Sequence, residues 1–121
     1  MKTAILLIGH GSRASEANEA MYKVAATLKE TQSVAIIECA FLEINQPDIS
    51  IGLSNCRLAG ATRVLAMPYF LHLGNHVQKD LPGIIATWQA ANPGIEVTMG
   101  RHFGYSPKLV ELVQERINEV L

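Results

Sequence analysis

The run from Ala4 to Gly9 places the tightest limit on how this chain can fold. All of its residues are apolar or glycine, without the alternation that marks a strand with one face in water. Such runs are typical of strands that are covered on both faces, and these belong to parallel sheets. His10 follows directly between two glycines, Gly9 and Gly11, which permit a tight turn at the end of the strand.

The rest of the chain repeats this pattern of a strand followed by a helix. Strict alternation predicts an α/β fold with a parallel sheet and right-handed crossovers. We expect a single four-stranded sheet with the flavodoxin-like order 2-1-3-4, helices on both faces, and one domain over residues 1–121. The predicted strands are 3–9, 34–42, 63–67 and 95–99. The first predicted helix is 14–30, and the second runs from 49 and closes at Gly60. The third starts between 76 and 81 and ends before 92, and the last starts at 107.

Caps and apolar spacing define these helices. Ser12 or Ser15 is predicted to cap the first helix, Pro82 to lie in the first turn of the third with Asp80 as its cap, and Ser106 to cap the last. Residues at helical spacing are predicted to form the apolar stripe of each helix. In the first helix the stripe is Ala17, Met21, Val24, Ala25 and Leu28, in the third it is Ile84, Ile85 and Trp88, and in the last it is Leu109, Leu112, Val113, Ile117 and Val120.

Composition excludes several classes of partner. Ten basic and eleven acidic residues give a net charge of −1, with no basic footprint for nucleic acid and no polybasic arm for a membrane. Cys39 and Cys56 lack the CxxC spacing of a zinc site and are predicted to be buried, reduced thiols. The apolar run after Lys2 is too short for a signal peptide or a membrane span, so we expect a cytoplasmic protein.

Polar side chains follow the end of every predicted strand. His10 follows the first strand, Glu43 the second, His72 and His76 the third, and Arg101 and His102 the fourth. The carboxyl ends of parallel strands share one edge, which is where ligands bind in open α/β sheets. Imidazole nitrogens suit Fe, Co, Ni or Zn, and also suit proton transfer near neutral pH.

These residues differ in how strongly they indicate function. The glycines around His10 leave its ring uncovered, which favours a functional role over a turn-shaping one. His76 is equally compatible with a solvent-facing position at a helix start, and Glu43 with a turn cap. Gly74 argues against one helix carrying both His72 and His76, so His72 is expected to line the pocket. Arg13, Arg101, Lys79 and Lys108 are ordinary surface charges that could also meet acidic ligand groups.

A competing motif lies in the same loop. Gly9-His-Gly-Ser-Arg-Ala14 satisfies the glycine fingerprint of dinucleotide-binding loops. The acidic residue expected about twenty positions later is missing, and a histidine inside the loop would crowd a pyrophosphate. A nucleotide-binding domain that uses the Gly9–Gly11 loop therefore remains an alternative.

Four segments of the chain resemble one enzyme family. They are Leu-Leu-Ile-Gly-His-Gly-Ser-Arg at 6–13, Ala-Phe-Leu-Glu at 40–43, Pro-Tyr-Phe-Leu-His-Leu-Gly-Asn-His-Val-Gln-Lys-Asp-Leu-Pro at 68–82 and Gly-Arg-His-Phe-Gly-Tyr-Ser-Pro at 100–107. In this order they resemble the small, single-domain sirohydrochlorin chelatases of the class II chelatase family, of the short cobaltochelatase type. The histidine-rich insertion of some relatives is absent.

The resemblance implies insertion of a divalent metal, Co²⁺ or alternatively Fe²⁺ or Ni²⁺, into sirohydrochlorin, with no tightly bound cofactor. His10 and His76 would bind the ion and accept pyrrole protons, with Glu43 nearby. It also implies a homodimer that encloses the macrocycle. A non-catalytic carrier of metal or tetrapyrrole is the alternative. The expected substrate-binding residues are Gly11, Ser12, Arg13, Tyr69, Phe70, His72, Arg101 and His102.

Overall fold

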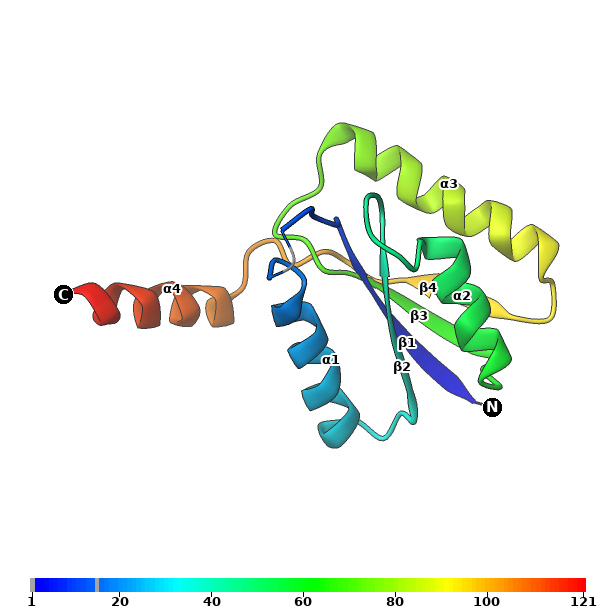
Figure 1. Ribbon diagram of the computed structural model, residues 1–121, viewed down its shortest axis with the longest axis horizontal. Helices are drawn as coiled ribbons and strands as arrows, with labels where there is room; N and C mark the ends of the chain where they lie inside the picture. Colours follow the sequence, from blue (N-terminus) through cyan, green and yellow to red (C-terminus); the bar gives the residue numbers. More distant parts are fainter. Residues whose placement is uncertain (1, 15) are drawn as a thin grey trace.

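A four-stranded parallel sheet organises the computed structural model, which describes residues 2–14 and 16–121. Its strand order, β2-β1-β3-β4, confirms the predicted topology (Figure 1). Helices alternate with the strands along the chain, as expected. The elements are β1 (Thr3–Gly9), α1 (Glu19–Thr31), β2 (Ile36–Phe41), α2 (Ile49–Leu58), β3 (Arg63–Pro68), α3 (Asn75–Ala91), β4 (Glu96–Met99) and α4 (Pro107–Val120).

The main core lies between the sheet and the two helices α2 and α3. Leu6 and Ile8 of β1 point to this face and are fully buried, as is Leu53 of α2. Ile85 and Trp88 of α3 are buried here too, which confirms the predicted inner face of that helix. The indole Nε1 of Trp88 donates to Ser54 Oγ at 3.0 Å and so joins the two helices.

A second, smaller core lies on the opposite face of the sheet. Helix α1 covers β2 and part of β1 there, and Met21 packs with Leu7, Cys39 and Phe41. Both cysteines are free and buried, as predicted. In the described part of the chain no helix covers this face over β3, so Met67 stays only partly buried.

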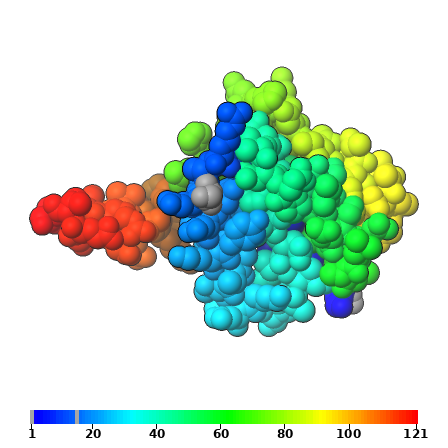
Figure 2. All heavy atoms as spheres, viewed as in Figure 1, coloured from blue at the N-terminus to red at the C-terminus, as the bar shows by residue number. Residues whose placement is uncertain are grey.

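Helix α4 corrects the expectation that every helix packs on the sheet. It extends away from the sheet and the other helices, as the ribbon and the space-filling view show (Figures 1 and 2). None of its residues is buried, and Val113 and Ile117 of the predicted stripe are 51% and 48% exposed. The connection before it is fixed to the loop after β3, because Phe103 N donates to Phe70 O and Gly104 N to Leu71 O.

Two helix starts also differ from the prediction. Helix α1 begins at Glu19 rather than near residue 14, and its N-cap Asn18 makes no side-chain capping bond. Ser12 Oγ instead accepts from Ala14 N in a local turn, a frequent competitor of helical capping. Ala17 precedes the helix and is exposed, and Ser15 lies outside the described residues.

Helix α3 begins earlier than expected, at Asn75, with Gly74 as its N-cap residue. Pro82 therefore lies inside the helix rather than in its first turn, and Asp80 is no cap. Side-chain caps hold two other helix starts. Ser106, as predicted, accepts from Lys108 N at the start of α4, and Asp48, which was not predicted, accepts from Ile51 N at the start of α2. Among the helices described, none is long and apolar enough to cross a membrane.

Candidate functional site

The ends of β1 and β2 bring His10 and Glu43 together. Main-chain hydrogen bonds between the segments that follow β1 and β2 continue past the strands, because Leu42 N donates to Gly9 O and Glu43 N to His10 O. The two side chains then face each other, with His10 Nε2 3.0 Å from Glu43 Oε1. Their side chains are 56% and 58% exposed, so the pair is accessible to a ligand from solvent.

Gly11 shapes the loop that carries His10. Its φ of +101° lies in the region that favours glycine, and a Cβ there would stand 1.9 Å from the carbonyl oxygen of Glu43. The next amide, Ser12 N, donates to Asn45 Oδ1 at 2.6 Å. The backbone of this predicted substrate-binding segment therefore makes internal contacts. Sequence reasoning missed Asn45, whose only signal was its place in a turn just after Glu43.

Phe70 adjoins His10 at the end of β3. Tyr69 N donates to Ile8 O, which extends the pairing of β1 and β3 beyond the strands. The Phe70 and His10 rings then meet edge to face, with centroids 6.0 Å apart. Tyr69 packs on the other side of the sheet, where its ring lies 5.0 Å from that of Phe103. Of the predicted loop aromatics, Phe70 is the one in contact with the His10 ring.

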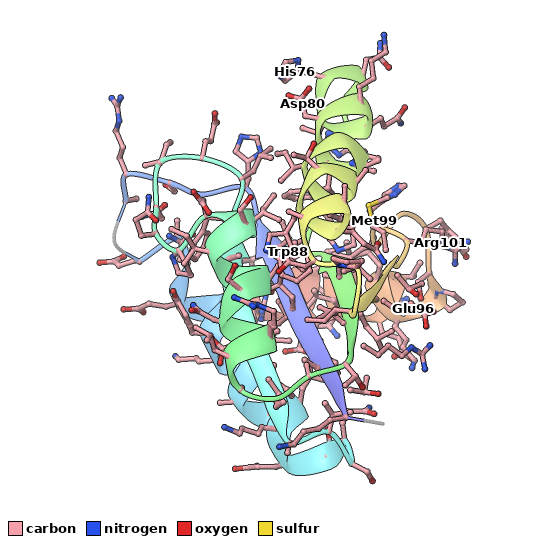
Figure 3. All side chains as sticks on the ribbon, turned by 90° about the vertical axis from the view of Figure 1, so that its right-hand side faces the viewer. His76, Asp80, Trp88, Glu96, Met99 and Arg101 are labelled. Atoms are coloured by element: carbon pink, nitrogen blue, oxygen red, sulfur yellow. The ribbon has the colours of Figure 1, made fainter. Side chains whose placement is uncertain are left out.

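His76 lies in the first turn of α3 and forms a second imidazole–carboxylate pair. Its Nε2 is 2.7 Å from Asp80 Oδ2, one helical turn further on. The His76 side chain is 87% exposed, and Figure 3 shows the pair at the free end of the helix. Asp80 was predicted only as a cap. In the described part of the chain, no hydrogen bond or ion pair links His76 to His10.

The remaining predicted residues lie around the same edge of the sheet without joining the His10 pair. Arg13, His72 and Arg101 are exposed, and His102 is half-buried. Arg101 follows β4, well away from His76 in the side-chain view (Figure 3). Within the described ranges, no hydrogen bond or ion pair engages the side chains of these four residues. The structure thus brings together three of the predicted site residues, His10, Glu43 and Phe70, and leaves these four separate from them.

One chain offers few ligands for a metal ion. Across residues 2–14 and 16–121, no group of three or more His, Cys, Asp or Glu side chains is arranged to hold one. Burial raises the pKa of the Cys39 thiol to about 11 and that of Cys56 to about 12, so both thiols stay protonated and are poor ligands.

The glycine loop does not have the geometry of a dinucleotide site. In such sites a helix begins at the glycine turn and directs its free amides at the phosphates. Here α1 begins only at Glu19, and the Ser12 amide is already bonded to Asn45. The nucleotide-binding alternative therefore lacks structural support.

The fold and the site define an open α/β protein with an accessible imidazole–carboxylate pair at the carboxyl edge of its parallel sheet, the edge at which such sheets bind ligands. The chain belongs to the CbiX family, whose model matches residues 4–120. It is 34% identical to the sirohydrochlorin cobaltochelatase of Methanococcoides burtonii, with 99% of this chain aligned to 98% of that one. It is also 31% identical to the sirohydrochlorin ferrochelatase of Bacillus subtilis, of which it covers 46%.

The solved structures add a likeness in three dimensions. The chain superposes on the cobalt complex of the sirohydrochlorin chelatase SirB from Bacillus subtilis subspecies spizizenii with a TM-score of 0.92 and 32% identity. The match covers 99% of this chain and 51% of that one. Several of the curated relatives are likewise about twice as long as this chain, or longer.

Proposed function

We propose that this protein inserts a divalent metal into sirohydrochlorin, with Co²⁺ as the first choice and Fe²⁺ or Ni²⁺ as alternatives. The observation that carries the proposal is the solvent-accessible His10–Glu43 pair at the carboxyl edge of the sheet, where β1 and β2 end. The end-to-end match to a relative named as a cobaltochelatase supports the choice of metal. The metal ion is a substrate in this reaction and not a resident cofactor.

The His10–Glu43 contact supports a defined role for each ring nitrogen. Glu43 contacts Nε2, so in the neutral imidazole a proton on Nε2 is donated to the carboxylate. That tautomer leaves the lone pair on Nδ1, which can bind the incoming ion or accept a proton from a pyrrole nitrogen. A carboxylate that holds a ligating histidine in one tautomer is a recurrent feature of metal sites. Glu43 thus positions His10.

The chemistry of metal insertion requires two protons to leave the tetrapyrrole nitrogens as the ion enters. A base within hydrogen-bonding reach speeds such a transfer. His76, held by Asp80, is the second base and ligand of the proposal. Phe70 stands beside the His10 ring and offers an apolar surface to the macrocycle. Arg13 and Arg101 are exposed cations that suit its carboxylates.

We also propose that the active form is a homodimer of single α/β domains. The chain has about half the length of the SirB chain that it matches, and by itself it supplies only part of a metal coordination shell. Two copies would provide two His10–Glu43 pairs around one macrocycle. We expect a mass in solution of twice the chain mass of 13.2 kDa. A mass equal to that of one chain at micromolar concentration would contradict this part of the proposal. A cytoplasmic location stays a prediction.

Anaerobic absorbance spectroscopy tests the proposed reaction. Sirohydrochlorin is mixed with Co²⁺, Fe²⁺ or Ni²⁺, with and without the protein, and the rate of metallation is compared with the blank. We expect a protein-dependent rate that is highest with Co²⁺ and is lost in His10→Ala. A spectrum that shifts on binding but metallates no faster than the blank would identify a carrier instead. Stabilisation by a nucleotide but by neither substrate would restore the nucleotide-binding alternative.

A further inference from the structure

The turn that follows β2 holds one residue in a strained conformation. Asn45 N donates to Glu43 O at 2.8 Å, which closes a three-residue turn around Ile44. The φ of Ile44 is 71°, so this is the form of γ-turn that is rare because it strains the backbone. A β-branched side chain makes a positive φ more unfavourable still. Such a conformation persists only where the contacts around it hold it in place.

Packing of the side chain does little to hold this turn, because Ile44 is 56% exposed. Main-chain bonds hold the segments on either side of the turn instead. Glu43 N donates to His10 O at 3.1 Å, and Phe41 N donates to Pro47 O at 2.9 Å. Neither bond reaches the tip of the turn. The tip is held by a side chain.

That side chain is Asn45, which fastens the turn to the loop that carries His10. Asn45 Oδ1 accepts from Ser12 N at 2.6 Å, and both residues are half-buried. Gly11 allows the two segments to come this close. A Cβ at Gly11 would overlap the carbonyl oxygen of Glu43 and would stand 3.3 Å from Asn45 Oδ1.

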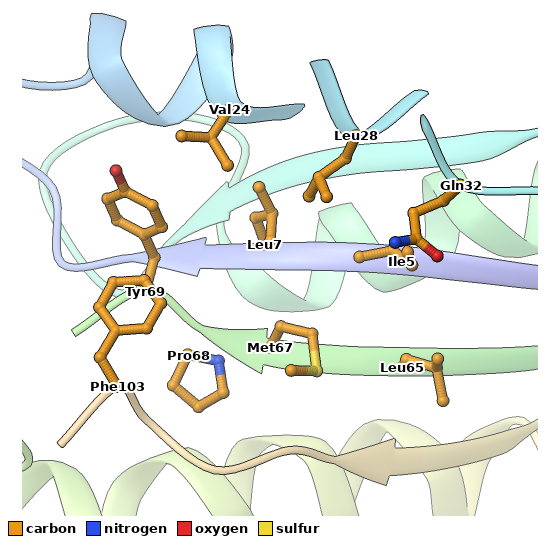
Figure 4. Close-up of a pocket in the computed structure, with 10 residues that line it drawn as sticks. All are labelled: Ile5, Leu7, Val24, Leu28, Gln32, Leu65, Met67, Pro68, Tyr69 and Phe103. Atoms are coloured by element: carbon orange, nitrogen blue, oxygen red, sulfur yellow. The ribbon is translucent and has the colours of Figure 1, made fainter. Parts of the chain in front are cut away.

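The His10 ring depends on Glu43 for its orientation. Among the described residues, Glu43 Oε1 is the one hydrogen-bond partner of the ring, 3.0 Å from Nε2. Phe70 meets the ring edge to face and has no polar atom in its side chain. Tyr69 is turned to the opposite side of the sheet, where it meets Phe103 (Figure 4). The position of the Glu43 carboxylate therefore decides which ring nitrogen carries the proton.

We propose that Asn45 is a positioning residue for metal insertion. Its bond to Ser12 N holds the strained turn, and the turn places the Glu43 carboxylate on the imidazole. Without that bond, Ile44 relaxes from its positive φ and carries Glu43 away from the ring. The ring then loses its fixed tautomer, and Nδ1 of His10 is no longer held ready for the ion or for a pyrrole proton. The link to catalysis rests on the function proposed above.

Two substitutions separate this bond from the rest of the side chain. Asn45→Ala removes the acceptor, whereas Asn45→Asp keeps an oxygen in the same place on a side chain of the same size. Asn92→Ala is the matched control. Asn92 is also half-buried, and its Nδ2 donates to a main-chain oxygen, Trp88 O, at 2.8 Å. It lies at the end of α3, before β4 begins, and so at the amino edge of the sheet.

Anaerobic metallation kinetics give the first readout. We expect kcat to fall roughly 10-fold in Asn45→Ala with an unchanged KM for sirohydrochlorin, as when an outer partner of a ligating histidine is lost. Asn45→Asp should keep the wild-type kcat, because a carboxylate accepts from an amide at least as well. Asn92→Ala should keep it too, since that bond lies far from the site. An unchanged kcat in Asn45→Ala, or an equal loss in Asn45→Asp, would overturn the proposal.

A double-mutant cycle tests whether Asn45 acts through Glu43. In Glu43→Ala the carboxylate is absent, so nothing remains for Asn45 to position. We expect Asn45→Ala to lower kcat in the wild-type background and to have no further effect in the Glu43→Ala background. Equal losses in the two backgrounds would show that Asn45 acts independently of Glu43 and would overturn the proposal.

NMR spectroscopy of the His10 ring tests the positioning without metallation. Long-range proton–nitrogen spectra of the neutral ring distinguish a protonated nitrogen from one with a free lone pair. The signals of His10 are assigned by their loss in His10→Gln. We expect the proton on Nε2 in the wild type, Asn45→Asp and Asn92→Ala, and a mixture of both tautomers in Asn45→Ala. A single tautomer in Asn45→Ala would overturn the proposal.

The NMR and kinetic readouts fail separately. A wild type that shows the Nε2 tautomer, loses it in Asn45→Ala and yet metallates no faster than the blank would support the placement of Glu43 by Asn45. That result would overturn the proposed function alone. A wild type that metallates, with a rate and a tautomer that Asn45→Ala leaves unchanged, would overturn the role of Asn45 and leave the proposed function standing.

Discussion

His10 and Glu43 meet across the ends of two neighbouring parallel strands, with 3.0 Å between Nε2 and Oε1. The contact depends on the register of the sheet, in which Gly9 is paired with Phe41. It depends also on two main-chain bonds beyond the strands, from Leu42 N and Glu43 N. Because both side chains are more than half exposed, the attraction between them adds little to stability, and its value lies in orienting the ring.

Glu43→Gln tests that orienting role. The amide keeps the size of the side chain and removes its charge, so the Nε2 contact loses its preference for a donating imidazole. We expect the metallation rate to fall roughly 10- to 100-fold, as is usual when a partner of a ligating histidine is altered, with an unchanged circular dichroism spectrum. The control Glu96→Gln removes an equal charge from exposed β4. Equal rates for the two variants would exclude Glu43 from the site.

A pair of glycine substitutions tests the loop that carries His10. Gly11→Ala would place a Cβ 1.9 Å from Glu43 O at a φ of +101°, so we expect a loss of roughly 1–3 kcal/mol in the free energy of unfolding. Gly83 lies within α3, and a Cβ there meets nothing within 4 Å. Gly83→Ala should therefore raise the free energy of unfolding by about 0.5–1 kcal/mol. Urea unfolding followed by Trp88 fluorescence measures both. A stable Gly11→Ala would show that the loop can take another path.

The strands and their order could be predicted because buried apolar runs and strict alternation leave few topologies. The shared edge of the histidines followed from that order. The contact between His10 and Glu43 could not be predicted, because it requires a strand register that no local pattern encodes. The late start of α1 was missed because Ser12 bonds Ala14 N in a turn, which resembles a helix cap in sequence.

Helix α4 shows a different limit of sequence reasoning. Its spacing correctly predicted a helix with an apolar stripe, begun by Ser106 and Pro107. A stripe indicates that a face will be buried, but it does not specify the surface that buries it. The bonds from Phe103 and Gly104 to the loop after β3 decide the direction of α4, and they join segments far apart in the sequence.

The hydrogen bond between Trp88 and Ser54 joins the two helices of the main core. Its length is 3.0 Å, and the Trp88 side chain is buried, so loss of either partner leaves a polar group without its bond. We expect the double-mutant cycle of Trp88→Phe and Ser54→Ala to give a coupling of about 0.5–1.5 kcal/mol. Urea unfolding followed by circular dichroism measures it, since Trp88→Phe removes the only tryptophan. Strictly additive effects would show that the bond contributes nothing.

The buried thiols make stability depend on pH in the alkaline range. Burial raises the pKa of Cys39 to about 11 and that of Cys56 to about 12, from a value near 9. Between these values the folded chain holds protons that the unfolded chain has released, so the free energy of unfolding falls as pH rises. The contribution is fully present below pH 9 and is lost by about pH 12.

Urea unfolding at a series of pH values from 8 upward measures this dependence. We expect a decline that begins near pH 9 and is shallower in Cys56→Ala, because that variant has one fewer thiol to ionise. A thiol reagent supplies an independent measurement. At pH 8 it should label Cys39 and Cys56 only as fast as the protein unfolds, since both thiols are buried and protonated in the folded chain. Rapid labelling of the folded protein would contradict the assigned burial.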